Sequence, residues 1–334
     1  MGGKALNRYG VHTERKNTDK FRRIGYELQT RVGEDLGYNT AIITCYRTKA
    51  DHGDLDLLIC VPDKNLINWR NYIENVFKPQ AIYSNGGVHS FDYQNFQVDF
   101  IPILESKWKS ALVYFSYDPL GNIMGKTYHK FNLSYGWEGL FYKYRNFRGT
   151  NSKNILLTND VTKIFEFGGY DYDRYLKGFD TLEEIFKFAI DSKYFDTEMF
   201  QMENLKSIDK KRNRKRGSYH LFLQYLKDNN INTKYSFYEQ KDLYIIDIDS
   251  AFPEANLLDQ LHDLQVKDEL DQALAEKFNG NVVMQWLPEL QGKELGIAMG
   301  NFKKTLGNDY VDIISNYPIE DIQDLFMKTY NGEK

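Results

Sequence analysis

The pattern of apolar and polar positions predicts short strands in the first third of the chain. Residues 54–59 and 96–103 are mostly apolar runs in which single acids take alternate positions. Such runs are typical of half-buried strands. Because side chains alternate between the two faces of a strand, Asp54 and Asp56 should share one face while the leucines beside them enter a core. Asp99 repeats this arrangement in the second run.

Helical spacing of apolar residues marks other stretches. Residues 17–32 carry Phe21, Ile24, Leu28 and Val32 at intervals that place them on one side of a helix. A Thr-x-x-Glu capping box predicts the start of another helix at residue 181. Helices are therefore expected at 17–32, 65–77, 181–193, 220–226, 257–278, 292–306 and 319–330.

Three other stretches suggest turns or strands. Asn85–Gly87 supplies a turn between two strand-like runs. Residues 155–172 look like a hairpin that turns at Asn159–Asp160, and residues 242–249 fit a strand or a buried turn. The order strand, strand, helix, strands indicates an α+β fold: a small mixed sheet with flanking helices, followed by a mostly helical C-terminal domain.

Three carboxylates come together if the two acid-bearing strands are neighbours. Asp54, Asp56 and Asp99 would then repel one another unless cations or protons neutralise them. Carboxylates with no His or Cys cluster nearby suit Mg²⁺. Two such ions, roughly 3.5–4 Å apart, can clamp the attacking and leaving oxygens of a phosphoryl displacement. Solvated acids on an open sheet face are the alternative, which fits one such acid better than it fits all three.

These motifs resemble a known family. Gly53–Leu58 together with Val98–Pro102 is similar to the palm of the DNA polymerase beta superfamily of nucleotidyltransferases, and the likeness to family X DNA polymerases runs from about residue 40 to 195. The resemblance implies that Asp54, Asp56 and Asp99 are catalytic and bind two Mg²⁺, with Mn²⁺ as a substitute. The implied reaction adds a nucleoside monophosphate from a (d)NTP to a nucleic-acid 3′-hydroxyl and releases pyrophosphate.

The resemblance also implies a nucleotide site. Arg47 falls where family X polymerases bind the triphosphate, and Ala111–Phe115 resembles the segment whose Tyr-Phe pair lies against the sugar. Thr181–Phe186 resembles the last helix of the thumb. The nucleotide-binding residues implied in this way are Thr44, Arg47, His52, Gly53, Tyr114, Phe115, Asn122 and Lys126.

The chain departs from the family at several positions. Ile43-Thr44 stands where the superfamily has Gly-Ser or Gly-Gly, and His52 replaces a small residue beside the triphosphate. The residues before Ile42 are too few for the helix-hairpin-helix domain of family X, so gap repair of the beta type is not expected. Residues 287–296 are loosely similar to a segment of CCA-adding enzymes and poly(A) polymerases, which keeps an RNA-terminal nucleotidyltransferase open.

Composition places the chain among ordinary globular proteins. It has 334 residues, 42% of them hydrophobic and 27% charged, and no apolar run long enough for a membrane span. This length allows two domains, and we expect a catalytic core at 1–200 and a helical, nucleic-acid-contacting domain at 201–334. Two cysteines, Cys45 and Cys60, fit buried free thiols in a reducing compartment. A cytoplasmic location is expected, and a viral protein in a host cytoplasm would fit the same features.

One dense basic block stands out against a net charge of −4. With that overall charge, nucleic-acid binding requires a local patch. The block would contact the phosphates of an acceptor strand, DNA or RNA, although a solvated linker is the alternative. Its basic residues are Lys210, Lys211, Arg212, Arg214, Lys215 and Arg216. Transferases that modify a protein or a small molecule, and a non-catalytic nucleic-acid-binding protein, are the further alternatives, while oligomeric state is not predicted.

Overall fold

The computed structural model describes residues 3–62, 64 and 67–332. The chain folds into two compact units. The first unit comprises residues 1–143 and 154–256, and the second comprises residues 144–153 and 257–334. The sequence analysis divided the chain at residue 200, whereas residues 201–256 belong to the first compact unit.

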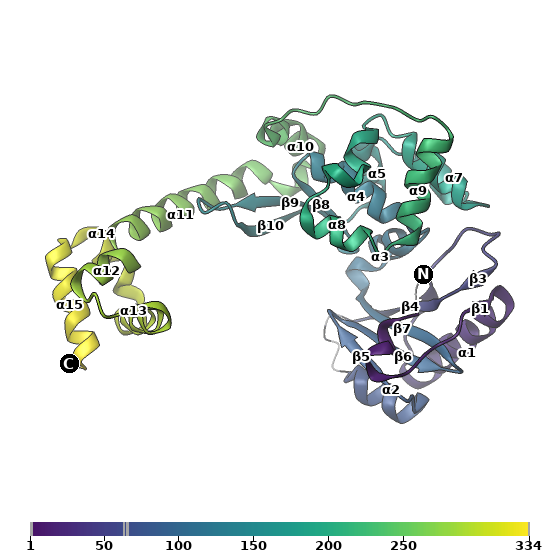
Figure 1. The fold of residues 1–334 in the computed structure, drawn as a ribbon, viewed down its shortest axis with the longest axis horizontal. Coiled ribbons are helices and arrows are strands. Elements are labelled where there is room, and N and C mark those ends of the chain that lie inside the picture. The colour runs from purple at the N-terminus through teal and green to yellow at the C-terminus, as the bar shows by residue number, and fades with distance from the viewer. Residues whose placement is uncertain (1–2, 63, 65–66, 333–334) are drawn as a thin grey trace. The chain divides into compact units, whose positions relative to one another are not determined.

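A five-stranded mixed sheet is the centre of the first unit (Figure 1). The strand order is β2-β4-β7-β6-β5, with β4 parallel to β7 and the other pairs antiparallel. The expected turn at Asn85–Gly87 joins β5 to β6. The strands are β2 (Thr40–Ile42), β4 (Asp54–Val61), β5 (Ile82–Asn85), β6 (Val88–Tyr93) and β7 (Phe96–Leu104).

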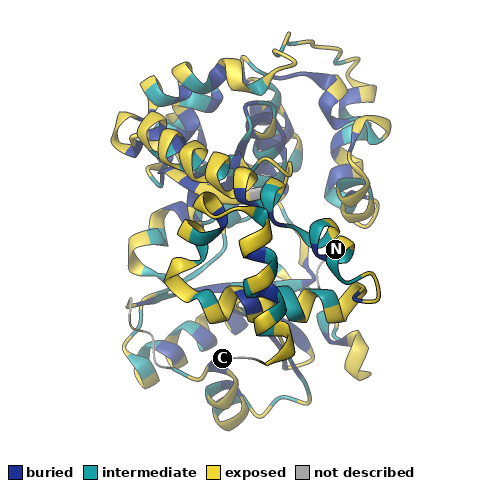
Figure 2. Cartoon of the chain, turned by 90° about the vertical axis from the view of Figure 1, so that its left-hand side faces the viewer, coloured by how far each residue is buried: buried dark blue, intermediate teal, exposed yellow. Residues whose placement is uncertain are grey.

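The two faces of this sheet are covered differently. Helices α1 (Thr18–Leu36) and α2 (Trp69–Phe77) pack on one face, where Leu55, Leu57 and Phe100 are fully buried. On the other face Leu58 and Ile101 pack against α3 (Trp108–Phe115). Figure 2 shows the buried positions inside these layers. The acids of β4 and β7 belong to this second face, beyond the end of its apolar cluster.

Helices and most of a small sheet complete the first unit; residues 144–145 of β9 and 151–153 of β10 are assigned to the second unit. The three-stranded sheet has the order β10-β9-β8, and two short strands, β1 (Lys16–Asn17) and β3 (Asp51–His52), pair separately. Side-chain caps fix several helix starts; for example, Thr181 Oγ1 accepts a hydrogen bond from Glu184 N at the start of α7. The strands are β8 (Leu133–Gly136), β9 (Gly139–Arg145) and β10 (Asn151–Thr158). The helices are α4 (Leu120–Lys130), α5 (Val161–Gly168), α6 (Tyr172–Leu176), α7 (Leu182–Ile190), α8 (Ser207–Asn213), α9 (Gly217–Asp228) and α10 (Ile245–Ala251).

The second unit is a helical bundle with its own core, in which Phe278, Phe302 and Phe326 lie in mutual ring contact. Its helices are α11 (Leu257–Lys277), α12 (Gly280–Trp286), α13 (Gly292–Leu306), α14 (Tyr310–Asn316) and α15 (Ile319–Asn331). Single 3₁₀ turns occur in both units at η1 (Ala5–Tyr9), η2 (Glu105–Lys107), η3 (Thr197–Phe200), η4 (Met202–Asn204), η5 (Lys241–Tyr244), η6 (Pro253–Ala255) and η7 (Gly307–Asp309).

The structure confirms the α+β class with a helical C-terminal region. The helices expected at 17–32, 181–193, 220–226, 257–278, 292–306 and 319–330 are present with shifted ends. The helix expected at 65–77 begins at Trp69, and residues 65–66 lie outside the described part of the chain. Within the described residues, no helix combines the length and the apolar character needed to span a bilayer.

Two expectations were wrong. No hairpin turns at Asn159–Asp160, because Asp160 instead caps α5 by accepting a hydrogen bond from Thr162 N at 2.9 Å. Residues 242–249 are helical, not a strand or a turn. There Tyr244 and Ile248, four residues apart, are buried, whereas Ile246 is 62% exposed, so burial follows a helical period in a run of mixed apolar and acidic residues.

Candidate active site

The parallel register of β4 and β7 brings the three predicted carboxylates onto one sheet face. Asp56 is the Cα partner of Asp99, and Asp54 is the partner of Gln97. Ser90 of β6 lies opposite Asp99 on its other side. Leu58 and Ile101, two residues further along each strand, begin the apolar cluster of this face. The acids therefore lie at the point where the sheet face changes from apolar to polar.

Crowding and burial disfavour the charged form of these acids. Burial is the main cause that raises the pKa of Asp56 well above its usual value, and the negative charges of Asp54 and Asp99 add to the effect. Burial, with the charge of Asp54, raises the pKa of Asp99 to about 6, although hydrogen bonds from Ser90 and Gln97 oppose the shift. The pKa of Asp54 is also raised by burial. Among the described residues, no Lys or Arg forms an ion pair with any of the three.

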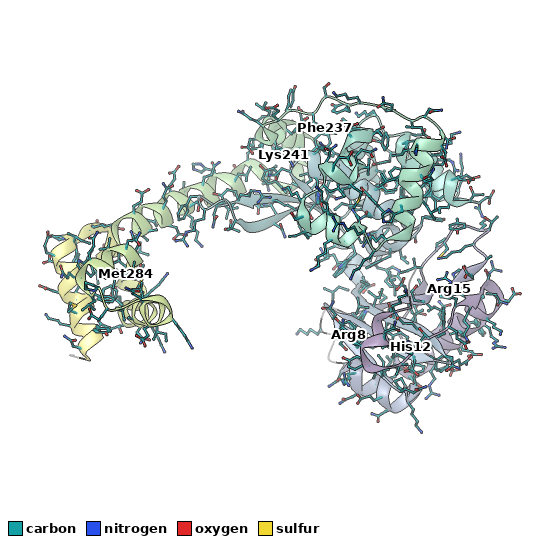
Figure 3. All side chains as sticks on the ribbon, in the orientation of Figure 1. Arg8, His12, Arg15, Phe237, Lys241 and Met284 are labelled. Atoms are coloured by element: carbon teal, nitrogen blue, oxygen red, sulfur yellow. The ribbon has the colours of Figure 1, made fainter. Side chains whose placement is uncertain are left out.

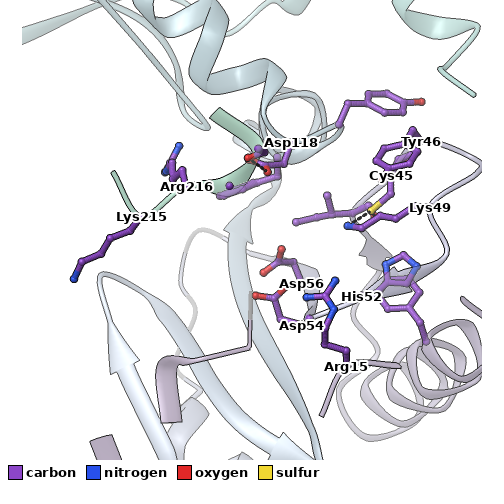
Figure 4. A pocket seen from close by; sticks show the side chains of 18 residues that line it. Arg15, Cys45, Tyr46, Lys49, His52, Asp54, Asp56, Asp118, Lys215 and Arg216 are labelled. Carbon is purple, nitrogen blue, oxygen red and sulfur yellow. Dashed lines mark hydrogen bonds between the residues drawn. The ribbon is translucent and has the colours of Figure 1, made fainter. Parts of the chain in front are cut away.

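Asp54 and Asp56 face a cavity of about 430 Å³ (Figure 4). This volume lies within the range of small-molecule sites. Several positively charged side chains line the cavity around the two acids, so a polyanion held there would meet both cations and carboxylates. They are Arg15 and Lys49 from the N-terminal part of the chain and Lys215 and Arg216 from the basic block.

Some cavity residues were not predicted from the sequence. Asp118 adds a fourth carboxylate that raises the pKa of Asp56, and it accepts a hydrogen bond from Ser218 Oγ at 3.0 Å. Lys49 lies on the other wall, where its Nζ is 3.5 Å from Cys45 Sγ. The Asp-Pro dipeptide at 118–119 marks a turn in the sequence and was the available signal for Asp118. Both cysteines are free and partly buried.

The predicted nucleotide-binding residues divide into two groups. Thr44, His52, Gly53 and Phe115 line the cavity. His52 is buried, and its ring stacks on Phe21 with centroids 3.8 Å apart. Burial lowers the pKa of His52 to about 4, so its imidazole ring is uncharged at pH 7.

The other predicted residues do not line this cavity. Arg47 lines an adjoining cavity of about 270 Å³ together with Arg22 and Lys49. Its guanidinium lies 2.6 Å from the carboxylate of Asp180 and also donates to the carbonyl of Lys177.

Tyr114, Asn122 and Lys126 lie on the helices behind the cavity. Tyr114 packs edge-on against Tyr135. The Oδ1 atom of Asn122 is buried without a hydrogen-bond partner. Lys126 is buried, and its Nζ is 2.7 Å from the carboxylate of Asp209 on α8.

The Lys126–Asp209 contact helps to place the basic block. Lys210, Lys211 and Arg212 form the last turn of α8, and Arg214 follows at its C-terminal end. The chain then turns so that Lys215 and Arg216 reach the cavity. Burial lowers the pKa of the Arg216 guanidinium, and the negative charge of Asp118 opposes the shift. The block thus belongs to the unit that carries the acids, whereas residues 257–334 contain fourteen Asp and Glu against seven Lys and Arg.

The donor chemistry of the acids fits a hard divalent cation. Asp54 and Asp56 offer carboxylate oxygens to the cavity, and no side-chain cation neutralises them within ion-pair distance in the described residues. In that part of the chain, however, no three Asp, Glu, His or Cys side chains gather closely enough to enclose a metal ion. Asp99 instead accepts hydrogen bonds from Gln97 Nε2 at 3.0 and 3.2 Å.

Comparisons with known proteins give a similarity of fold. No family model matches the sequence, and no curated protein matches it. Among solved structures, the Leishmania infantum polymerase beta ternary P/T complex is 17% identical, with a TM-score of 0.34 over 44% of this chain and 64% of that one. The ternary gap complex of that polymerase is 15% identical, with a TM-score of 0.34 over 53% and 67%. This chain thus spans about two thirds of the length of those structures, and the likeness at these values is one of fold only.

Proposed function

We propose that this protein is a metal-dependent nucleotidyltransferase that adds a nucleoside monophosphate from a (d)NTP to a nucleic-acid 3′-hydroxyl. The observation that carries the proposal is the parallel register of β4 and β7. It sets Asp56 beside Asp99, with Asp54 on the same face. Asp54 and Asp56 line a cavity that four cationic side chains also line, and Asp99 lies next to Asp56 outside that lining. A protein that only binds nucleic acid would gain nothing from crowded carboxylates whose charged form is disfavoured.

Asp54, Asp56 and Asp99 are the proposed ligands of two Mg²⁺ ions, for which Mn²⁺ can substitute. Bound there, the ions would neutralise the phosphates and lower the pKa of the attacking hydroxyl. Asp99 is the proposed acceptor of the proton of the 3′-hydroxyl, because the strand register places it directly opposite Asp56. The hydrogen bonds from Gln97 Nε2 orient its carboxylate.

The surrounding residues are proposed to bind the two substrates. Lys49 and Thr44 line both the main cavity and the adjoining cavity of Arg47, and we assign the triphosphate to that side, with Arg15 as a further cation of the main cavity. Phe115 and the neutral His52 ring supply apolar surface for the nucleoside. The remaining predicted contacts, Tyr114, Asn122 and Lys126, would act from behind the cavity wall.

Lys215 and Arg216 are proposed to hold the acceptor strand, with Lys210, Lys211, Arg212 and Arg214 along its backbone. The acidic residues 257–334 carry the wrong charge for this task. We therefore assign nucleic-acid contact to the basic block of the first unit and not to the C-terminal helices.

Primer extension tests the proposal. The substrates are 5′-labelled DNA and RNA primers, with and without template, supplied with dNTPs or NTPs in Mg²⁺ or Mn²⁺. Asp99→Ala and the isosteric Asp56→Asn should abolish transfer while keeping the native circular dichroism spectrum. Glu74→Gln, an exposed acid on α2 that pairs with Arg70, is the matched control and should keep full activity.

The outcomes separate the candidate functions. Template-directed dNTP addition to DNA identifies a DNA polymerase of the family X kind, whereas untemplated NTP addition to RNA identifies a terminal transferase. Metal-dependent nucleotide binding without extension of any primer would redirect the search to protein or small-molecule acceptors. Absence of both extension and metal-dependent nucleotide binding, or full activity in Asp99→Ala, would refute the proposal.

A further inference from the structure

Residues 3–17, here called the N-terminal strap, begin beside Asp54, run along the five-stranded sheet and end at β3. Three contacts anchor the strap to the sheet: Leu6 is buried, the Arg8 guanidinium lies 3.9 Å from the ring centroid of Tyr83, and Glu14 N donates to Asn95 O at 2.8 Å. Figure 3 labels Arg8, His12 and Arg15 along its course. The strap then pairs with β3 through β1. It is therefore a built part of the fold.

The strap makes two backbone hydrogen bonds at the acids. Gly3 N donates to Asp54 Oδ2 at 3.2 Å. Ala5 N donates to Gln97 Oε1 at 2.8 Å, and Gln97 Nε2 donates to both carboxylate oxygens of Asp99. One short stretch of backbone thus reaches Asp54 directly and Asp99 through a single side chain.

The orientation of the Gln97 amide depends on the strap. A glutamine amide has one accepting oxygen and one donating nitrogen. Because Ala5 N–H requires the oxygen on its side, the nitrogen must face Asp99. Gln97 is 3% exposed, so water has little access to replace either partner. Without the strap, the amide would lose the contact that selects this orientation.

The approach of the strap to Asp54 requires glycine at residue 3. Gly3 has a φ of +83°, and a Cβ atom there would lie 2.2 Å from the carbonyl oxygen of Gly53. Gly53 immediately precedes Asp54, so any side chain at residue 3 would push the strap away from the acid. Gly10, also in the strap, has a φ of +76° but no atom within 4 Å of its Cβ position.

We propose that the N-terminal strap sets the orientation of the Asp54 and Asp99 carboxylates for divalent-cation binding, with Gly3 and Gln97 as positioning residues. This inference rests on the proposed function, in which these carboxylates are the metal ligands. Hydrogen bonds that orient ligating carboxylates typically affect metal affinity by about 10–100-fold. The strap supplies such a bond directly to Asp54, and it acts on Asp99 through Gln97.

Mn²⁺ binding measured by electron paramagnetic resonance of the free ion tests the proposal without requiring turnover. Gly3→Ala and the volume-conserving Gln97→Met should each raise the half-saturating Mn²⁺ concentration by about tenfold. Gly10→Ala is the matched control, because it places the same side chain at the same kind of backbone conformation away from the acids. It should bind Mn²⁺ as the unmodified protein does. If transfer is observed, the Mg²⁺ requirement should rise in Gly3→Ala and Gln97→Met while kcat at saturating Mg²⁺ changes less.

The outcomes distinguish this inference from the proposed function. Strap-dependent Mn²⁺ binding that is lost in Asp56→Asn, in a protein that extends no primer, would support the strap and refute nucleotidyl transfer to a nucleic-acid 3′-hydroxyl. Unchanged Mn²⁺ affinity in folded Gly3→Ala and Gln97→Met proteins would refute the strap, and so would the absence of Mn²⁺ binding to the unmodified protein. Should Gly3→Ala fail to fold, Gln97→Met decides between these results.

Discussion

Asp56 of β4 lies directly opposite Asp99 of β7 in a parallel register, so two acids that are 43 positions apart in the sequence face one another across a single strand pair. Parallel pairing is the reason that both strands present their acids at the same end. Parallel neighbours cannot be joined by a tight turn and need a long crossover connection. Helix α2 and strands β5 and β6 lie in the connection between β4 and β7.

Metal-free protein should lose stability as the pH rises through 6 because of Asp99. The pKa of Asp99 is raised from 3.8 to about 6 in the folded state. Between these values the folded protein keeps a proton that the unfolded chain has released. The stabilisation is therefore complete below pH about 4 and is lost as the pH rises through 6, a loss of about 3 kcal/mol. Urea unfolding in the presence of a chelator measures this loss of stability. The unmodified protein and Asp99→Asn are compared at pH 4.5 and 7.5.

The comparison with Asp99→Asn removes from the result those groups whose titration does not depend on Asp99. The negative charge of Asp99 also raises the pKa of Asp56, so the difference between the two proteins reports these coupled acids together. His52, whose pKa is lowered to about 4, acts with the opposite sign, because its contribution is present above pH 6.5 and is lost as the pH falls through 4. Its effect is common to both proteins. The variant should gain stability relative to the unmodified protein as the pH rises, and a difference that is independent of pH would contradict the prediction.

Breaking the buried ion pair between Lys126 and Asp209 should destabilise the first unit. Their side chains are 9% and 29% exposed, with Nζ 2.7 Å from the carboxylate. Lys126→Met or Asp209→Asn leaves a charge without its partner, at a cost of about 3 kcal/mol, whereas Lys126→Met combined with Asp209→Leu should recover most of this loss. Denaturant unfolding at pH 7 gives the values. Arg31→Met, which breaks an exposed pair with Asp35, should cost far less, because solvent screens that pair.

Lys215 and Arg216 should contribute to nucleic-acid affinity in a salt-dependent way. Replacing both with Ala removes two phosphate contacts and should reduce the slope of log affinity against log salt by about 1–2 for a single-stranded oligonucleotide. Fluorescence anisotropy at several salt concentrations measures this slope. Lys303→Ala with Lys304→Ala, an adjacent pair of lysines on α13, provides the control. Equal effects of the two double variants would indicate general charge attraction to the oligonucleotide and would contradict specific binding by Lys215 and Arg216.

Removing the N-cap of α7 should cost about 1 kcal/mol. Thr181 Oγ1 accepts a hydrogen bond from Glu184 N, and Thr181→Ala leaves that donor without its side-chain partner. Chemical denaturation shows the loss as a lower midpoint with an unchanged slope. Thr162→Ala provides the comparison, since Thr162 lies in the first turn of α5, whose cap is Asp160. It should change stability by less than about 0.5 kcal/mol.

The sequence predicted those features that depend on local pattern. Asp54, Asp56 and Asp99 were found because strand alternation fixes the face to which a side chain belongs. The helix at 292–306 was found because its apolar residues recur at helical spacing. The run at 242–249 was missed because Ile246, Asp247, Ile248 and Asp249 alternate as in a strand, and only burial shows that Tyr244 and Ile248 share one side of a helix.

Residues brought to the cavity by tertiary structure were harder to predict. Asp118 reaches it because the turn before α4 lies beside the start of α9, where Ser218 holds its carboxylate. Gly3 reaches Asp54 across 51 positions of sequence. Lys126, in contrast, was expected beside the nucleotide, but its Nζ pairs with Asp209. Such pairings depend on which helices pack together, and periodicity along a single stretch contains no information about them.

The two walls of the cavity are synthesised at different times. All five strands of the acidic sheet, with the strap that reaches Asp54, are complete once residue 104 has been made, whereas Lys215 and Arg216 follow more than a hundred residues later. On the ribosome, the sheet can therefore fold and present its carboxylates before the opposing cations exist. A nascent chain stalled before α8 would display the acids with Arg15 and Lys49 beside them, but without Lys215 and Arg216. The proposed triphosphate side of the cavity is therefore made first, and the proposed acceptor side is made last.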